Sequence, residues 1–184
     1  MIDVSTLGGI ELRVPDAAEF MNRLYTFGFV KQPIGKTRYA VLTNEQGVVA
    51  DDGVAARLGE HHYYVTATTS GVDQVYRDML RWSAQWRLDL DIANVTSAFS
   101  AVNVGGPLSR QVLERAGCSV DLSSDSFPYL AYREAMVAGI PARMMRVGFI
   151  GELGYELHVP SPLIGDLWDR LLIAGEDIEI RPFG

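Results

Sequence analysis

Apolar and polar residues alternate along the chain with two different periods, which predict strands and helices. Short alternating or continuous apolar segments, with turn residues between them, predict four strands in the first half. These strands cover residues 9–14, 38–43, 48–58 and 62–68. Residues 72–86 instead repeat their apolar positions every three or four residues, as an amphipathic helix does. A shorter helix is predicted over residues 15–24, because Pro15 suits a first helical position and acidic residues follow it.

The same order of elements recurs in the second half of the chain. Pro107 follows Pro15 by 92 positions (107 minus 15), and the hairpin glycine Gly139 follows Gly47 by the same distance (139 minus 47). The second set of strands is predicted at residues 100–104, 132–137, 141–148 and 155–159, with helices at 107–117 and 162–174. We therefore expect an α+β fold of two similar subdomains of about 90 residues with antiparallel sheets, residues 1–92 and 93–184.

Two adjacent carboxylates, Asp51 and Asp52, interrupt the apolar run of residues 48–56. Successive side chains of a strand point to opposite faces, so one of the pair should face the interior and the other solvent or backbone donors. An inward carboxylate is costly unless it is paired, capped or used. The 92-residue offset places Arg143 and Met144 at these positions, so the fold alone does not demand acids there. A functional and a structural role for the pair both remain open.

Aromatic and polar residues elsewhere add candidates for a binding site. Tyr39 lies on the strand paired with the acids, where its ring either stacks on a flat ligand or packs in the core. Residues 148–156 carry glycine at every third position, which permits close backbone approach to a ligand but is also explained by turn geometry. Glu156 and His158 share one face of the next strand, where Glu156 is either a ligand-binding carboxylate or part of a solvated face.

Composition narrows the function classes. The formal net charge is −7 and the chain has no cluster of Lys and Arg, which argues against nucleic-acid binding. No uncharged apolar stretch approaches the roughly 20 residues of a membrane-spanning helix, so we expect no membrane partner. A single cysteine, Cys118, excludes an internal disulfide and fits a cytoplasmic location. His61 and His62 lack a third ligand at suitable spacing, so they are predicted to be solvated loop residues, with no metal site.

Several motifs occur together, in order, over nearly the whole chain. They are residues 3–5 with 9–12, the hairpin residues 38–42 with 47–52, Val-Gly-Gly-Pro at 104–107 and Gly-Glu-Leu-Gly-Tyr-Glu at 151–156. In this combination the chain resembles the folate-binding aminomethyltransferase family, which comprises the glycine-cleavage T-protein, the C-terminal part of the sarcosine oxidase alpha subunit, and dimethylglycine dehydrogenase. Residues 52–58, 127–134 and 138–143 look most like the sarcosine oxidase alpha subunit.

The resemblance implies tetrahydrofolate as cofactor and gives the residues their roles. It implies that Asp51 is the catalytic acid facing the reactive pterin nitrogens and that Asp52 is structural, although the sequence does not order the two acids. It implies that Glu156 accepts hydrogen bonds from the pterin amino and ring N–H groups. Three further cofactor-binding positions are implied, at Tyr39, Thr66 and Phe149. Thr66 stands where the T-protein has asparagine, and Phe149 replaces a tyrosine.

The resemblance also implies a reaction and its partners. Folate would capture a methylene iminium, the amine-derived one-carbon donor, to give methylenetetrahydrofolate and glycine. The flavin that oxidises sarcosine is expected only on another domain or subunit. Family members continue with an arginine-bearing helix and a C-terminal barrel, so residues 1–184 are expected to form a truncated, partial folate-binding domain with the barrel absent. Two alternatives stay open: a T-protein aminomethyltransferase, and a non-catalytic folate-binding or assembly module that self-associates.

Overall fold

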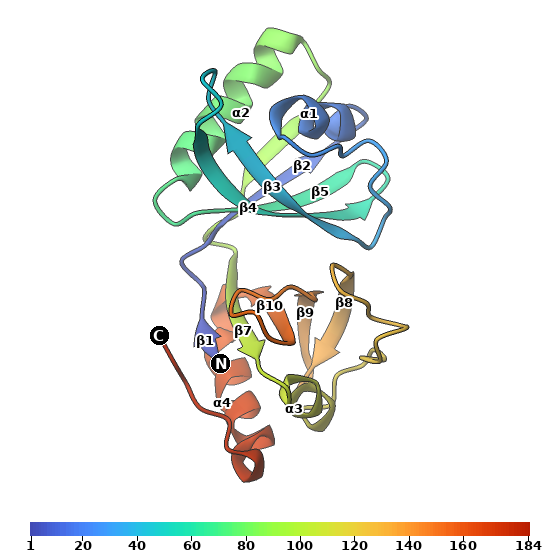
Figure 1. Cartoon of the computed structure of the whole chain (residues 1–184), viewed down its shortest axis with the longest axis vertical. Coiled ribbons are helices and arrows are strands. Elements are labelled where there is room, and N and C mark those ends of the chain that lie inside the picture. Colours follow the sequence, from blue (N-terminus) through green and yellow to red (C-terminus); the bar gives the residue numbers. More distant parts are fainter. The chain divides into compact units, whose positions relative to one another are not determined.

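The computed structural model describes residues 1–184, which form two compact units, each built on one five-stranded antiparallel sheet (Figure 1). The first unit is Leu7–Thr96, and the second unit is Met1–Thr6 together with Ser97–Gly184. Every strand pair in both sheets is antiparallel, and helices pack against each sheet. The predicted α+β class with two antiparallel sheets is therefore confirmed. No helix is both long enough and apolar enough to cross a membrane.

The sheet of the first unit has the strand order β3-β4-β5-β2-β6 and carries two helices. In chain order the elements are β2 (Gly8–Arg13), α1 (Ala17–Leu24), β3 (Thr37–Thr43), β4 (Val49–Gly59), β5 (His62–Ala67), α2 (Val72–Trp86) and β6 (Asp91–Asn94). Alternate residues of the central strands, such as Ile10 and Val65, are fully buried with Phe20 of α1 and Met79 of α2. This core fixes one face of the sheet under the helices.

The sheet of the second unit has the order β1-β7-β10-β9-β8. In chain order the elements are β1 (Ile2–Asp3), β7 (Phe99–Gly105), α3 (Ser109–Arg115), β8 (Tyr132–Val137), β9 (Ile140–Met145), β10 (Gly154–Pro160) and α4 (Ile164–Ala174), with short 3₁₀ turns at Ser161–Leu163 and Glu176–Ile178. Val102 and Leu157 of the central strands are fully buried with Leu113 of α3 and Leu167 of α4. The helices again cover one face only.

The two sheets repeat one plan, as the sequence predicted, but the boundaries differ from residues 1–92 and 93–184. In the first unit the fifth strand is β6, which follows α2 and pairs with β2. In the second unit the corresponding place is taken by β1 from the N-terminus, which pairs with β7. Neither two- to four-residue strand was predicted, because segments so short carry no clear period. Strand pairing therefore assigns residues 1–6 to the second unit and residues 93–96 to the first.

The offset between the two copies is not uniform, which corrects one prediction. In the central strands Val102 and Leu157 pair as Ile10 and Val65 do, 92 positions earlier (102 minus 10, 157 minus 65). The strand β9, which corresponds to β4, has a different offset. Met144 lies opposite Leu157, and Ala55 lies opposite Val65, so these two strands are related by 89 positions (144 minus 55).

The residues that correspond to the acid pair are consequently Ile140 and Pro141, rather than Arg143 and Met144. The longer β3–β4 hairpin causes the change, because Leu42 pairs with Asp51 whereas Val137 pairs with Ile140. Neither counterpart is acidic. The inference that the fold itself does not require acids there holds in the corrected register.

Close contact between β4 and β5 requires glycine at position 53. A Cβ built on Gly53 would lie 2.0 Å from the carbonyl oxygen of Thr66, a backbone atom that cannot turn aside. The same strand supplies a comparison in Gly59, whose added Cβ would meet only Cβ of His62 at 3.7 Å, an ordinary contact.

We predict that Gly53→Ala lowers the free energy of unfolding by at least about 2 kcal/mol, because the added methyl group forces β4 and β5 apart. The matched change Gly59→Ala should be near neutral. Urea unfolding followed by circular dichroism checks both variants. Equal stability of the two would show that the contact at Gly53 is easily relaxed.

Candidate functional site

Each sheet has a second face that its helices do not cover, and the strand registers place polar side chains there. In the first unit this face, called the first polar face, carries Glu11, Arg13, Tyr39, Asp52, His62, Tyr64 and Thr66. In the second unit the corresponding second polar face carries Asn103, Tyr132, Glu134, Arg143, Glu156 and His158. Residues that alternate with these form the two hydrophobic cores. The candidate site residues are best judged by the face on which they lie.

Asp51 lies on the helix-facing side of the first sheet, opposite Leu42. Its side chain is 7% exposed, and its Oδ1 accepts a hydrogen bond from the Thr68 hydroxyl. The Thr68 backbone N–H donates to Oδ2 at 3.3 Å. Gly71, the residue before α2, lies so near that an added Cβ would be 2.2 Å from Asp51 Oδ1. The hydrogen bonds of Asp51 therefore connect β4 to the turn that precedes α2.

Burial raises the pKa of Asp51 above its ordinary value, and the negative charge of Asp52 adds to the rise. The two hydrogen bonds from Thr68 act in the opposite direction. Burial, together with the charge of Asp51, also raises the pKa of Tyr25. Burial is thus the main reason that the charged form of the Asp51 carboxyl group is disfavoured.

Asp52 has the opposite placement. It is exposed and lies opposite Val41 on the first polar face, the same face as Tyr39, whose partner Val54 is two residues from Asp52. The expectation that one acid of the pair faces inward and the other outward is confirmed. Asp51 is on the other side of the sheet from Tyr39 and Thr66, so the structure does not bring these three predicted site residues together on one face. Regular alternation along β4, from the core residue Ala55 through Gly53 to Asp51, sets which acid faces which way.

Thr66 is on the first polar face, but its hydroxyl already serves the sheet. The Val54 backbone N–H donates to Thr66 Oγ1 at 2.9 Å, and the hydroxyl in turn lies 3.4 Å from the Val54 carbonyl oxygen. These bonds join β4 to β5 just beyond the last paired residues of the two strands, Ala55 and Val65. Thr66 thereby shapes the strand beside Asp52.

Glu156 lies on the second polar face, in β10, and is 8% exposed. Its Oε2 is 3.4 Å from Nε2 of His158, which is 2% exposed. Asn103 of β7 lies directly opposite Glu156. The predicted sharing of one face by Glu156 and His158 is what the structure shows, and these two residues are buried rather than solvated. Phe149, by contrast, is 88% exposed in the preceding loop.

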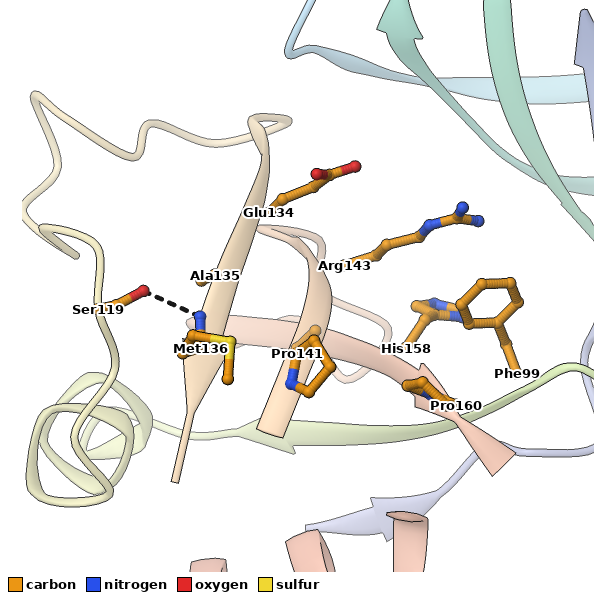
Figure 2. A pocket seen from close by; sticks show the side chains of 10 residues that line it. Phe99, Ser119, Glu134, Ala135, Met136, Pro141, Arg143, His158 and Pro160 are labelled. Atoms are coloured by element: carbon orange, nitrogen blue, oxygen red, sulfur yellow. Dashed lines mark hydrogen bonds between the residues drawn. The ribbon is translucent and has the colours of Figure 1, made fainter. Parts of the chain in front are cut away.

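A pocket of about 440 Å³ opens on the second polar face (Figure 2). Its lining includes polar side chains from three strands: Glu134 of β8, Arg143 of β9 and His158 of β10. The Arg143 guanidinium lies over the Phe99 ring, 4.2 Å from its centroid. Charged groups and apolar walls therefore meet beside His158.

Sequence reasoning did not single out Asn103, which is 1% exposed and whose Oδ1 and Nδ2 both lack a hydrogen-bond partner. The available signal was an amide within the apolar run of residues 101–104.

His62 was expected in solvent, but it lies in β5 with Nε2 3.1 Å from Glu11 Oε2. No group of three or more His, Cys, Asp or Glu side chains is arranged to hold a metal ion.

Comparison with known proteins places this geometry in a family. The family described as the GCVT N-terminal domain matches residues 1–184. The chain belongs to this family. Its relatives include the sarcosine oxidase subunit alpha of Corynebacterium sp. (strain U-96), 38% identical over all of this chain and 19% of that protein. The aminomethyltransferase of Listeria monocytogenes is 30% identical over all of this chain and 48% of that protein.

The GCVT-domain chain thus spans about a fifth of the sarcosine oxidase relatives and about half of the aminomethyltransferases. Two solved structures share its fold. The glycine cleavage system aminomethyltransferase T from Bartonella henselae superposes with a TM-score of 0.85 at 22% identity, covering all of this chain and 47% of that one. The heterotetrameric sarcosine oxidase from Corynebacterium sp. U-96 gives 0.74 at 16% identity, covering 99% of this chain and 86% of that one.

We predict that Asp51→Asn gains stability relative to the wild type as the pH rises from about 4 to 7. A carboxyl whose pKa is raised by folding stabilises the protein below its unfolded pKa, and that contribution is lost as the pH rises through the folded value. Asparagine has no such titration, so the variant lacks this loss.

Thermal unfolding of both proteins at several pH values checks this prediction. Asp52→Asn, which removes the exposed neighbouring charge, is the matched comparison. A wild-type-to-variant difference that stays constant over this pH range would contradict the prediction.

Proposed function

We propose that the chain is a tetrahydrofolate-dependent one-carbon transfer domain that serves sarcosine oxidation. The observation that carries the proposal is the buried carboxylate of Glu156 on the second polar face, in a member of the GCVT family. The relatives named sarcosine oxidase subunit alpha are 38–39% identical, whereas the aminomethyltransferases are 26–30% identical. This difference favours a methylene group derived from sarcosine over one delivered by the glycine cleavage system.

Glu156 is suited to recognise the edge of a pterin ring. Its two oxygens are acceptors, and a pterin presents an amino group and a ring N–H side by side, so one carboxylate can accept both. Burial at 8% exposure limits competition from water, which strengthens such charge-assisted bonds. His158, 3.4 Å from Oε2, helps to orient the carboxylate.

Asp52, rather than Asp51, is the proposed acid–base group. Asp51 is occupied with Thr68 at the start of α2, whereas Asp52 is exposed on the face that also carries Tyr39. As a nitrogen of the folate attacks the iminium carbon, it loses a proton that Asp52 accepts. When the bond between the glycine nitrogen and the transferred carbon breaks, Asp52 returns this proton to the glycine nitrogen. The negative charge also stabilises the positive iminium before attack.

Folate binding is tested by calorimetric titration of the chain with 5-formyltetrahydrofolate, a stable reduced folate. We predict binding by the wild type and a loss of affinity of about tenfold or more in Glu156→Gln, because a charged acceptor is replaced by a neutral amide. Glu152→Gln, four residues earlier in the exposed loop, should bind normally. An absence of binding by the wild type would refute the folate proposal.

The acid is tested by supplying a sarcosine-oxidising flavoprotein, sarcosine and tetrahydrofolate to each variant. Asp52→Asn should lower the rate of methylenetetrahydrofolate formation about a hundredfold, with released formaldehyde rising in compensation. Asp51→Asn should retain most of the rate. The reverse outcome would assign the catalytic role to Asp51 and refute the role proposed for Asp52.

A further inference from the structure

Asn103 presents an unused hydrogen-bonding group next to Glu156. It lies in β7, directly opposite Glu156 in β10, so both side chains are on the second polar face. The residue is 1% exposed, yet neither Oδ1 nor Nδ2 of its amide has a hydrogen-bond partner. A buried donor and acceptor without partners destabilise the folded protein, so such groups call for a specific explanation.

The internal duplication supplies a comparison for this position. The central strands of the two units are related by 92 positions, so the counterpart of Asn103 is Glu11 (103 minus 92). Glu11 is also buried, but its Oε2 accepts a hydrogen bond from Arg13 at 2.8 Å and lies 3.1 Å from His62 Nε2. In the first unit the polar group at this place is thus paired within its own sheet.

The second unit lacks both of those partners. The positions of Arg13 and His62 correspond to Gly105 and Gly154, which pair with each other in β7 and β10. Glycine offers no side chain that could bond to the Asn103 amide. The same scaffold therefore pairs the buried polar group in one copy and leaves it without a partner in the other.

A partly exposed side chain lies beside the amide. A Cβ built on Gly105 would lie 2.7 Å from Cδ1 of Ile150 and 3.2 Å from Oδ1 of Asn103, so Ile150 lies next to the amide. Ile150 is 40% exposed and belongs to the loop between β9 and β10 that contains Gly148 and Gly151. An outward shift of this side chain would open the amide to a ligand.

We propose that Asn103 is a specificity-determining residue that donates from Nδ2 to the carbonyl oxygen of the pterin ring, while Glu156 accepts the adjacent N–H groups. The inference rests on the proposed function, because it takes the ligand to be a folate. A pterin edge presents one acceptor followed by two donors, and an amide beside a carboxylate presents one donor followed by two acceptors. Directly opposite residues of an antiparallel pair are close enough for both to reach one ring edge.

The first test is Asn103→Leu, which keeps the side-chain size and removes both polar atoms. Its melting temperature without ligand should equal that of the wild type or exceed it by about 2–4 °C, because no unpaired amide remains. Its affinity for 5-formyltetrahydrofolate should fall by about tenfold or more, because the ring carbonyl loses its donor.

Asn22→Leu is the matched comparison, since Asn22 Oδ1 accepts a hydrogen bond from the Phe29 N–H at 3.0 Å. That variant should lose stability and keep its folate affinity. If Asn103→Leu instead loses stability as Asn22→Leu does and binds folate normally, Asn103 is a structural amide and the proposal is wrong.

The second test inverts the specificity. Asn103→Asp replaces the donor by an acceptor, so it should weaken binding of 5-formyltetrahydrofolate by tenfold or more. A 2,4-diaminopteridine antifolate has an amino group in place of the carbonyl and no hydrogen on the adjacent ring nitrogen, so it should bind the wild type more weakly than 5-formyltetrahydrofolate, and Asn103→Asp should narrow this difference. Equal losses for both ligands would contradict a contact with the carbonyl.

The outcomes separate this inference from the function on which it rests. Folate binding by the wild type that is weakened by Glu156→Gln but unchanged in Asn103→Leu refutes the role of Asn103 and leaves the proposed function standing. An absence of folate binding by the wild type refutes the proposed function itself.

Discussion

In each unit one antiparallel pair of central strands holds a single register, with Ile10 opposite Val65 in the first and Val102 opposite Leu157 in the second. These four side chains are fully buried beneath the helices, so a shift by one residue would expose a hydrophobic face and bury a polar one. The register thereby fixes which residues reach the two polar faces. Glu156 and Asn103 meet on one face only because the hydrophobic core holds their neighbours on the other.

The duplication shows how one scaffold carries different chemistry in its two copies. At corresponding places the first unit has Glu11 paired with Arg13 and His62, and the second has Asn103 beside two glycines. The longer β3–β4 hairpin introduces a bulge and places an acid at a position where the second unit has the buried Ile140. Changes in hairpin length and in partner side chains therefore alter the polar faces while the cores stay alike.

Two buried carboxylates of this protein have different surroundings. Asp51 and Glu156 are similarly inaccessible, at 7% and 8% exposure, but their surroundings differ. Asp51 accepts two hydrogen bonds from Thr68 on the helix side of its sheet, which explains why the chain keeps a carboxylate there. Within its own sheet, the Glu156 carboxylate has one neighbouring polar side chain, His158, which lies near Oε2. The carboxylate can therefore accept further hydrogen bonds from a ligand.

The sequence by itself determined the type and order of the main elements, their duplication, and the sharing of one face by Glu156 and His158. All of these depend on local periodicity, which neighbouring residues set. Only the tertiary structure decided that Asp51 faces the helices and Asp52 does not, because the pairing of β4 with β3 and β5 sets which side of the strand the helices cover. Likewise, only the structure assigned β1 and β6 to their sheets and left the Asn103 amide without a partner. Pairing between distant strands determines both, and no local pattern reports it.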